Sequence, residues 1–126
     1  MAMKKNKVLI VDDQPGMTET LADILEDEGC EVATAANGVQ ALRHVAAHSV
    51  DMVLMDLIMP GMNGVETFRA LKRVSPHTPV VMMTGYQITH LVQDAMDEGS
   101  VAMLQKPVDP GLLVGIVLNT LQSGEA

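Results

Sequence analysis

The sequence predicts an α/β fold in which a doubly wound, five-stranded parallel sheet carries helices on both faces. Five short apolar runs recur at similar intervals along the 126 residues, and segments with helical periodicity lie between them. The runs are KVLIV (7–11), EVATA (31–35), DMVLM (51–55), PVVMM (79–83) and VAML (101–104). Alternating strands and helices are typical of βαβ units, whose strands are parallel and whose helices cover the sheet.

The five runs are interpreted as strands because most of them are continuously apolar instead of alternating. Strands that are covered on both faces show this pattern. The helices are predicted from apolar stripes at helical spacing. In chain order the first four stripes are Met17, Leu21, Ile24 and Leu25; Ala41, Leu42, Val45 and Ala46; Val65, Phe68, Leu71 and Lys72; and Ile88, Leu91, Val92, Ala95 and Met96. A last helix is predicted over 109–123. Gly29 and Gly99 are predicted helix C-caps, and Asn37-Gly38 a turn.

Composition limits the class of protein. A chain of this length suits one domain, which we expect to span residues 1–126 with an ordered core over about 6–122. The net charge of −8 opposes the phosphates of nucleic acids and anionic lipids, so we expect this chain to bind neither nucleic acid nor membrane directly. The single Cys30 cannot form an internal disulfide, and the N-terminus does not resemble a signal peptide. The cytoplasm is the expected location.

Acidic residues follow the ends of two predicted strands. Asp12 and Asp13 come after the first strand, and Asp56 after the third. Ligands of such sheets bind beyond the carboxyl ends of the strands, so we expect the three carboxylates to converge there. Asp12 and Asp13 can both take part only if the chain is already leaving the sheet, which Pro15 supports. A divalent cation would offset the repulsion among the acids, and ligands that are all oxygen favour Mg²⁺.

A hydroxyl and an ammonium group complete the predicted site. Thr84 follows the fourth strand and Lys106 the fifth, and with the acids and Mg²⁺ they suit a phosphoryl group. A carboxylate can then be the nucleophile and form an acyl phosphate. Asp56 is the best candidate because it stands alone at the central strand. The loop PGMNG (60–64) would turn the chain past the metal, where we expect the backbone carbonyl of Ile58 to complete the coordination.

Four fragments, VLIVDD, LMDLIMPGMNG, VVMMTG and LQKP, together resemble the receiver domain of two-component response regulators over essentially the whole chain. The resemblance implies a flavodoxin-like (βα)5 fold and transfer of a phosphoryl group to Asp56 from a phosphohistidine of a histidine kinase or histidine phosphotransfer protein. It implies that Asp12 and Asp13 hold Mg²⁺ and that Thr84 and Lys106 contact the phosphoryl group. Such a protein is a signalling phosphoacceptor that assists its own phosphorylation and dephosphorylation, and not an enzyme with a turnover substrate.

The resemblance also implies a cis bond between Lys106 and Pro107. Three residues before this lysine, receivers usually carry Tyr or Phe, whose ring changes burial as the threonine moves toward the phosphoryl group. Met103 stands there instead, which predicts a weaker switch or one that is read elsewhere. Ile58 and Tyr86, beside the acceptor and the threonine, have no carboxylate or amide to orient a water. We therefore expect slow hydrolysis of the acyl phosphate.

The last helix (109–123) has a second apolar stripe formed by Val114, Leu118 and Leu121. A helix that is apolar on two faces is usually covered on both. In receiver domains the face formed by the fourth helix, the fifth strand and the fifth helix commonly mediates dimerisation or partner contact, so we expect it to bind a second copy or an effector here. The alternative is a few exposed aliphatic side chains, which protein surfaces tolerate.

His44 and His48 are four residues apart on the second predicted helix and could mimic a pair of metal ligands. They fall outside the apolar stripe of that helix and lack a further ligand in the sequence, so a solvated helix face is favoured.

Other functions stay open as alternatives. A Mg²⁺-dependent phosphohydrolase with an aspartyl-phosphate intermediate shares these residue types, but such enzymes usually need a second acid two residues after the nucleophile, where Ile58 stands. A binding module with an unreactive site is disfavoured by the intact set of acids, threonine and lysine. An NAD-binding domain is disfavoured because VDDQPG (11–16) replaces the glycine-rich turn. No effector domain follows the last helix, so a stand-alone regulator, a relay intermediate and a receiver from a longer protein are all compatible.

Overall fold

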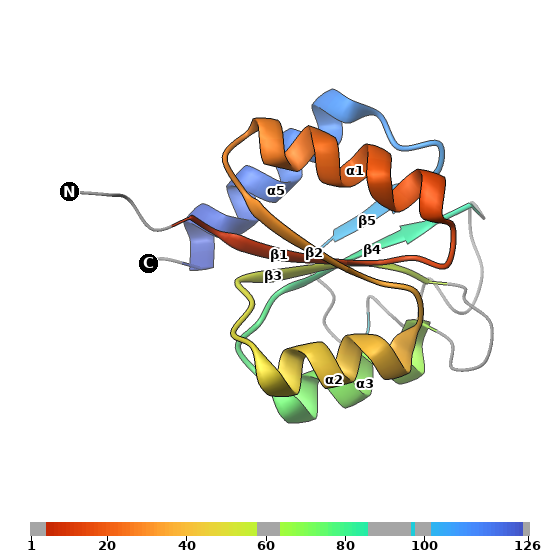
Figure 1. Ribbon diagram of the computed structural model, residues 1–126, viewed down its shortest axis with the longest axis vertical. Coiled ribbons are helices and arrows are strands. Elements are labelled where there is room, and N and C mark those ends of the chain that lie inside the picture. The colour runs from red at the N-terminus through yellow and green to blue at the C-terminus, as the bar shows by residue number, and fades with distance from the viewer. Residues whose placement is uncertain (1–4, 58–63, 86–96, 98–101, 125–126) are drawn as a thin grey trace.

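The computed structural model describes residues 5–57, 64–85, 97 and 102–124 (Figure 1). In chain order its elements are β1 (Lys7–Val11), α1 (Pro15–Asp27), β2 (Glu31–Ala35), α2 (Gly38–Ala47), β3 (Met52–Asp56), α3 (Gly64–Val74), β4 (Val80–Thr84), β5 (Ala102–Gln105) and α5 (Pro110–Gly124). The five strands form one parallel sheet in the order β2-β1-β3-β4-β5. This confirms the predicted fold class. The helix predicted around 88–96 and the cap at Gly99 lie outside the described residues.

Helices cover both faces of the sheet, with α1 and α5 on one face and α2 and α3 on the other (Figure 1). Side chains alternate between the faces along each strand. In β1, Leu9 and Val11 pack with α2 and α3, whereas Val8 and Ile10 pack with α1 and α5. All residues of β3 and β4 are buried. Because both faces of the central strands are covered, the continuously apolar runs were correctly interpreted as strands.

The register of the sheet aligns the strand ends that carry the predicted site. Asp56 pairs with Met83 in β4, and Thr84 pairs with Gln105 in β5. The parallel ladder also continues one residue past two strands, because the Asp12 N–H donates to the Ala35 carbonyl at 3.1 Å and the Lys106 N–H donates to the Thr84 carbonyl at 2.7 Å. Residues just beyond the strands are therefore held as firmly as the strands themselves.

Local sequence explains where the first two helices begin and end. Pro15 occupies the first position of α1, where a missing N–H costs nothing, and Gly29 after α1 has a φ of 89°, which favours glycine. The Asn37 side chain accepts a hydrogen bond from the Gln40 N–H at 2.9 Å and so caps α2. Asn37-Gly38 therefore starts a helix rather than forming the free-standing turn that the sequence suggested.

Helix α5 corrects one prediction. Leu121 is only 4% exposed and belongs to the core between the sheet, α1 and α5, so it is not part of an outer apolar stripe. The reason is that Leu121 follows the buried Val117 by one helical turn and so points toward the same core. Val114 and Leu118 are half-buried. None of the helices in the described part of the chain combines the length and apolar character needed to cross a bilayer.

Candidate functional site

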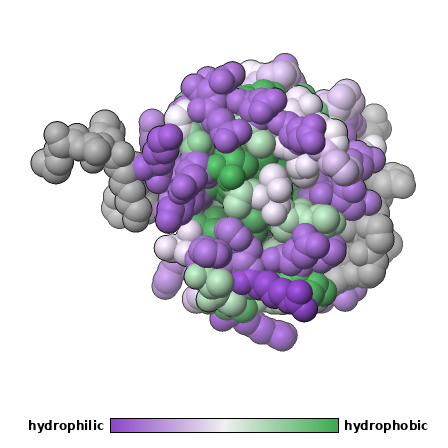
Figure 2. Space-filling model, in the orientation of Figure 1, coloured by the Kyte–Doolittle hydropathy of each residue, from purple (hydrophilic) through white to green (hydrophobic). Residues whose placement is uncertain are grey.

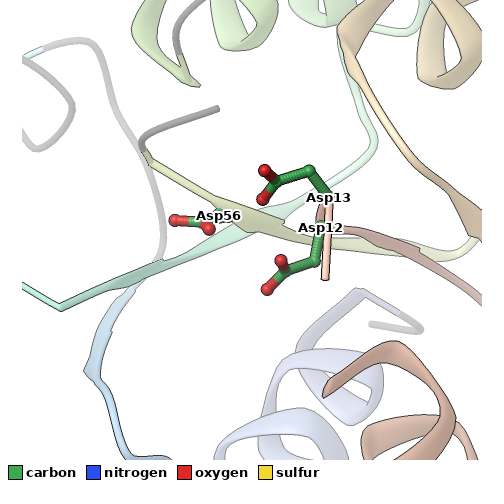
Figure 3. Close-up of side chains that lie close together, drawn as sticks. All are labelled: Asp12, Asp13 and Asp56. Atoms are coloured by element: carbon green, nitrogen blue, oxygen red, sulfur yellow. The ribbon is translucent and has the colours of Figure 1, made fainter. Parts of the chain in front are cut away.

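Three aspartates converge at the carboxyl edge of the sheet (Figure 3). Asp12 and Asp13 follow β1, Asp56 is the last residue of β3, and each offers one carboxylate oxygen within 4.8 Å of those of the other two. Asp12 is 2% exposed and Asp56 6%, whereas Asp13 is exposed. The chain leaves the sheet at Asp12, which lets two adjacent aspartates share one site. The predicted convergence of the three acids is therefore observed.

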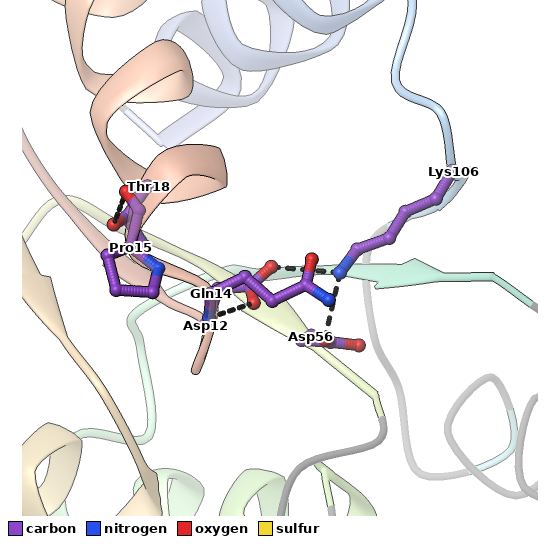
Figure 4. Close-up of polar contacts among 6 residues, drawn as sticks. All are labelled: Asp12, Gln14, Pro15, Thr18, Asp56 and Lys106. Carbon is purple, nitrogen blue, oxygen red and sulfur yellow. Dashed lines mark hydrogen bonds and ion pairs between the residues drawn. The ribbon is translucent and has the colours of Figure 1, made fainter.

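Lys106 joins this cluster from the end of β5 (Figure 4). Its ammonium donates hydrogen bonds to Asp12 Oδ2 and to Asp56 Oδ2, each at 2.9 Å. The other oxygen of Asp12, Oδ1, accepts the Gln14 N–H at 3.0 Å. Two buried carboxylates thus share one cation, which offsets part of the cost of removing them from water. The Lys106–Pro107 peptide bond is cis, as the resemblance implied.

The ion pairs change the titration of the lysine. Burial alone would lower the pKa of the Lys106 ammonium, but its hydrogen bonds and charge attraction to Asp56 and Asp12 outweigh burial and raise the pKa above its ordinary value. Lys106 is therefore positively charged throughout the physiological range. It offers a fixed positive charge at the place where a phosphoryl oxygen bound to Asp56 would lie.

Thr84 lies on β4, which is next to β3, and Met103 lies on β5, which is next to β4 at the edge of the sheet. Thr84 ends β4 and is 2% exposed, which places its hydroxyl at the same sheet edge as Asp56. Met103, in β5, is half-buried and packs against the core on the α2 and α3 side, next to Met82 in the register. Met103 thus packs against the hydrophobic core. Ile58 and Tyr86 lie outside the described residues.

A hollow beside the acids was not foreseen from the sequence. It measures about 220 Å³, and besides Asp12 and Asp13 its lining includes Thr18, Thr34 and Gln40. Thr34 and Gln40 come from β2 and α2. Their position near the carboxyl end of β2 could have identified them, since the same kind of position identified the acids at the ends of β1 and β3.

The donor set decides which ions the acids can hold. In the part of the chain that the structure describes, the cluster offers three carboxylates and no imidazole or thiolate ligand, which suits a hard cation that prefers oxygen. The exposed Asp13 leaves room for water ligands, as Mg²⁺ requires. The residues present therefore fit a divalent cation of the Mg²⁺ type. Together with a lysine and a buried threonine, such a site can stabilise the charge of a phosphoryl group.

Residues 8–118 match the response regulator receiver domain. The match covers most of the chain, which therefore belongs to the receiver domains of two-component response regulators. These proteins are signalling domains whose partners are histidine kinases. Family membership does not favour the phosphohydrolase that the sequence left open as an alternative.

Known relatives agree with this assignment. The chain is 36% identical over 107 residues to sporulation initiation phosphotransferase F of Bacillus subtilis, a match covering 85% of this chain and 86% of that protein. It is 36% identical over 125 residues to the DNA-binding response regulator MtrA of Mycolicibacterium smegmatis, covering 99% of this chain but only 54% of that protein. The solved structure of a CheY-like receiver domain protein from Methanospirillum hungatei has a TM-score of 0.93 at 29% identity, covering 97% of this chain and 98% of that one.

Proposed function

We propose that Asp56 is the phosphoacceptor and that it takes its phosphoryl group from a phosphohistidine of a histidine kinase or a histidine phosphotransfer protein. The observation that carries this proposal is the double contact of Lys106, which holds its ammonium 2.9 Å from Asp56 Oδ2 and 2.9 Å from Asp12 Oδ2. A carboxylate that receives a phosphoryl group needs a nearby fixed cation, and Asp56 has one.

The roles of the three acids follow from their surroundings. Asp12 is tied on both oxygens, by the Gln14 N–H and by Lys106, so it is a positioned ligand and a poor nucleophile. Asp13 is exposed and follows the strand by two residues. Asp56 ends the central strand β3, where the phosphoryl group can reach Thr84 at the end of the neighbouring β4 and Lys106 just after β5. This division of roles makes Asp56 the nucleophile.

The transfer is a direct exchange of one bond for another. An oxygen of the Asp56 carboxylate attacks phosphorus, the P–N bond to the imidazole breaks, and its electron pair stays on the nitrogen of the leaving histidine. Lys106 meets the charge on one phosphoryl oxygen, and the Thr84 hydroxyl donates to another. In this proposal the protein assists its own phosphorylation and the later hydrolysis, and has no turnover substrate.

Mg²⁺ is the cofactor in this proposal. Asp12, Asp13 and Asp56 would hold it, with the backbone carbonyl of Ile58, which lies outside the described residues, as a further ligand. When bound, the ion supplies charge neutralisation at the phosphoryl oxygens. The chain's own part is to keep the carboxylates converged, and the hydrogen bonds to Asp12 serve that purpose.

Phosphorylation would be read by partners on the face formed around β5 and α5. A phosphoryl group adds charge and strong acceptors that Thr84 and Lys106 can meet, which biases an existing equilibrium toward an active surface. Val114 and Leu118 on α5 are half-buried and form the apolar part of this face that a second copy or an effector would cover. We also propose that residues 1–126 form one receiver domain and that the protein acts in the cytoplasm. Its net charge of −8 opposes the phosphates of nucleic acids, so we expect no direct contact with them.

Intact mass after incubation with acetyl phosphate and Mg²⁺ tests the proposal. We expect one phosphoryl group on the wild type, and none on Asp56→Asn or in the absence of metal. Asp23→Asn, which changes an exposed aspartate of α1, is the matched control and should be phosphorylated normally. A phosphoryl group retained by Asp56→Asn would place the acceptor elsewhere. Multiple turnovers of a phosphomonoester by the wild type would instead support a phosphohydrolase.

A further inference from the structure

A second hollow lies at the opposite end of the sheet from the acid cluster. It measures about 220 Å³, and its lining includes Lys7 at the start of β1, Glu31 at the start of β2, and His44 and His48 at the end of α2. Figure 2 faces the β2 edge of the sheet, where hydrophobic side chains lie exposed within a surround of hydrophilic ones. Ligand pockets for drug-sized molecules are usually larger, about 300–1,000 Å³, so this hollow suits an ion with its water ligands better than an organic ligand.

The two histidines are held together by the end of α2. His44 lies in the last turn, and His48 is the residue after the helix, whose N–H donates to the His44 carbonyl at 2.8 Å. Their ring centroids are 4.8 Å apart, with the ring planes inclined by 34°. His44 is half-buried and His48 exposed. The helix end therefore places the two histidines side by side, and solvent can reach them.

We propose that His44 and His48 form a binding site for a borderline divalent transition-metal ion such as Zn²⁺, with Glu31 as the neighbouring carboxylate. Two imidazoles bound to one tetrahedral Zn²⁺ at about 2.0–2.1 Å have ring centroids about 5 Å apart, which is close to the observed 4.8 Å. The observed ring separation is therefore compatible with both imidazoles binding the same ion.

The chemistry of the hollow supports a metal of this class. Imidazole nitrogens select zinc, copper or nickel over Mg²⁺. Glu31 and Lys7 both line the hollow, and the negative charge of Glu31 offsets the positive charge of Lys7. Among the described residues no third His, Cys, Asp or Glu brings a ligand atom within 4.8 Å of both histidines, so water completes the coordination.

This site is distinct from the one that would hold Mg²⁺. The acid cluster lies beyond the carboxyl ends of β1 and β3, whereas the histidine hollow lies where β1 and β2 begin. The ligand types also differ, since the acid cluster offers only carboxylate oxygens, whereas the histidine hollow offers two imidazoles. An ion bound to the histidines would clamp the last turn of α2 and leave Asp56 accessible.

Isothermal titration of the full chain with ZnCl₂ in excess Mg²⁺ tests the proposal. We expect one Zn²⁺ per chain, and a loss of affinity of about tenfold or more in His44→Gln and in His48→Gln, since even changes to outer partners of metal ligands cost about 10–100-fold. His77→Gln, at an exposed histidine after α3, is the matched control and should bind normally. Asp13→Asn should also bind normally, because it alters only the acid cluster.

Two results would overturn the proposal. One is Zn²⁺ binding that is equally tight in His48→Gln and in the wild type, and the other is an absence of binding to the wild type. His48 is exposed, so its replacement leaves the fold intact, and circular dichroism of the variant verifies this. Zn²⁺ should also raise the melting temperature of the wild type and of His77→Gln, but not that of His48→Gln.

Discussion

Lys106 is the counter-charge of two carboxylates that the fold removes from water. Its replacement by Met keeps the length of the side chain but leaves Asp12 and Asp56 buried without their cation. Loss of one partner from such a group is strongly destabilising, and we expect the free energy of unfolding without metal to fall by about 2 kcal/mol. Urea denaturation of Lys106→Met in EDTA measures this loss.

Lys5→Met is the matched control for this change because Lys5 is an exposed lysine just before β1. The folded-state pKa of Lys106 is raised, so its contribution is fully present below the ordinary pKa of 10.5 and is lost as the pH rises through the folded-state value. The difference between Lys106→Met and wild type should therefore be the same at neutral and at mildly alkaline pH. A difference no larger than that of Lys5→Met would show that the ion pairs contribute nothing to stability.

At the scale of elements, α5 carries the surface that we propose binds a partner. Val114 and Leu118 are half-buried, while Leu113, Val117 and Leu121 fill the core. If the outer residues mediate self-association, a carboxylate at Leu118 places a charge in an apolar contact, which is costly. We expect Leu118→Glu to sediment as a monomer under conditions in which phosphorylated wild type forms dimers.

Asn119→Glu is the matched control for α5 because it adds the same charge at the next, exposed position of the helix. It should dimerise like the wild type. If Leu118→Glu still forms the oligomer, this face of α5 does not mediate self-association. Its aliphatic side chains would then be an ordinary part of the protein surface.

The elements themselves were largely predictable, because their signals are local. Apolar runs, most of them continuous, identified all five strands, and Pro15 and Gly29 marked the bounds of α1. It was harder to predict which face of a helix a given residue lies on. Leu121 lies about one turn after Val117 and about two turns after Val114, so its spacing fits either face. Only the packing of α5 against the core decides which face it lies on.

At the scale of the whole molecule, the topology explains why the candidate site could be predicted. A parallel sheet brings every strand's carboxyl end to one edge, so residues far apart in sequence such as Asp12 and Lys106 meet there. The sequence could not show that Lys106 bridges two of the acids, nor that His44 and His48 line a hollow with Glu31. Those facts depend on rotamers and on the packing of α2 beside β2.

The same topology concentrates three negative charges and one positive charge at that edge, so metal binding and global stability are linked. An ion that binds only the folded state adds about 1.4 kcal/mol to the free energy of unfolding when its free concentration is about ten times Kd. Mg²⁺ should therefore raise the melting temperature of the wild type by several degrees. EDTA should reverse the shift.

Asp13→Asn separates charge repulsion from metal binding, because Asp13 is exposed and its replacement leaves the core unchanged. Without metal we expect this variant to be at least as stable as the wild type, since one of three mutually repelling carboxylates is gone. With Mg²⁺ it should gain much less, because a ligand has been lost. Thermal unfolding of both proteins with and without Mg²⁺ measures the two effects. An equal Mg²⁺ shift in Asp13→Asn and wild type would mean that the ion stabilises the fold from somewhere other than the acid cluster.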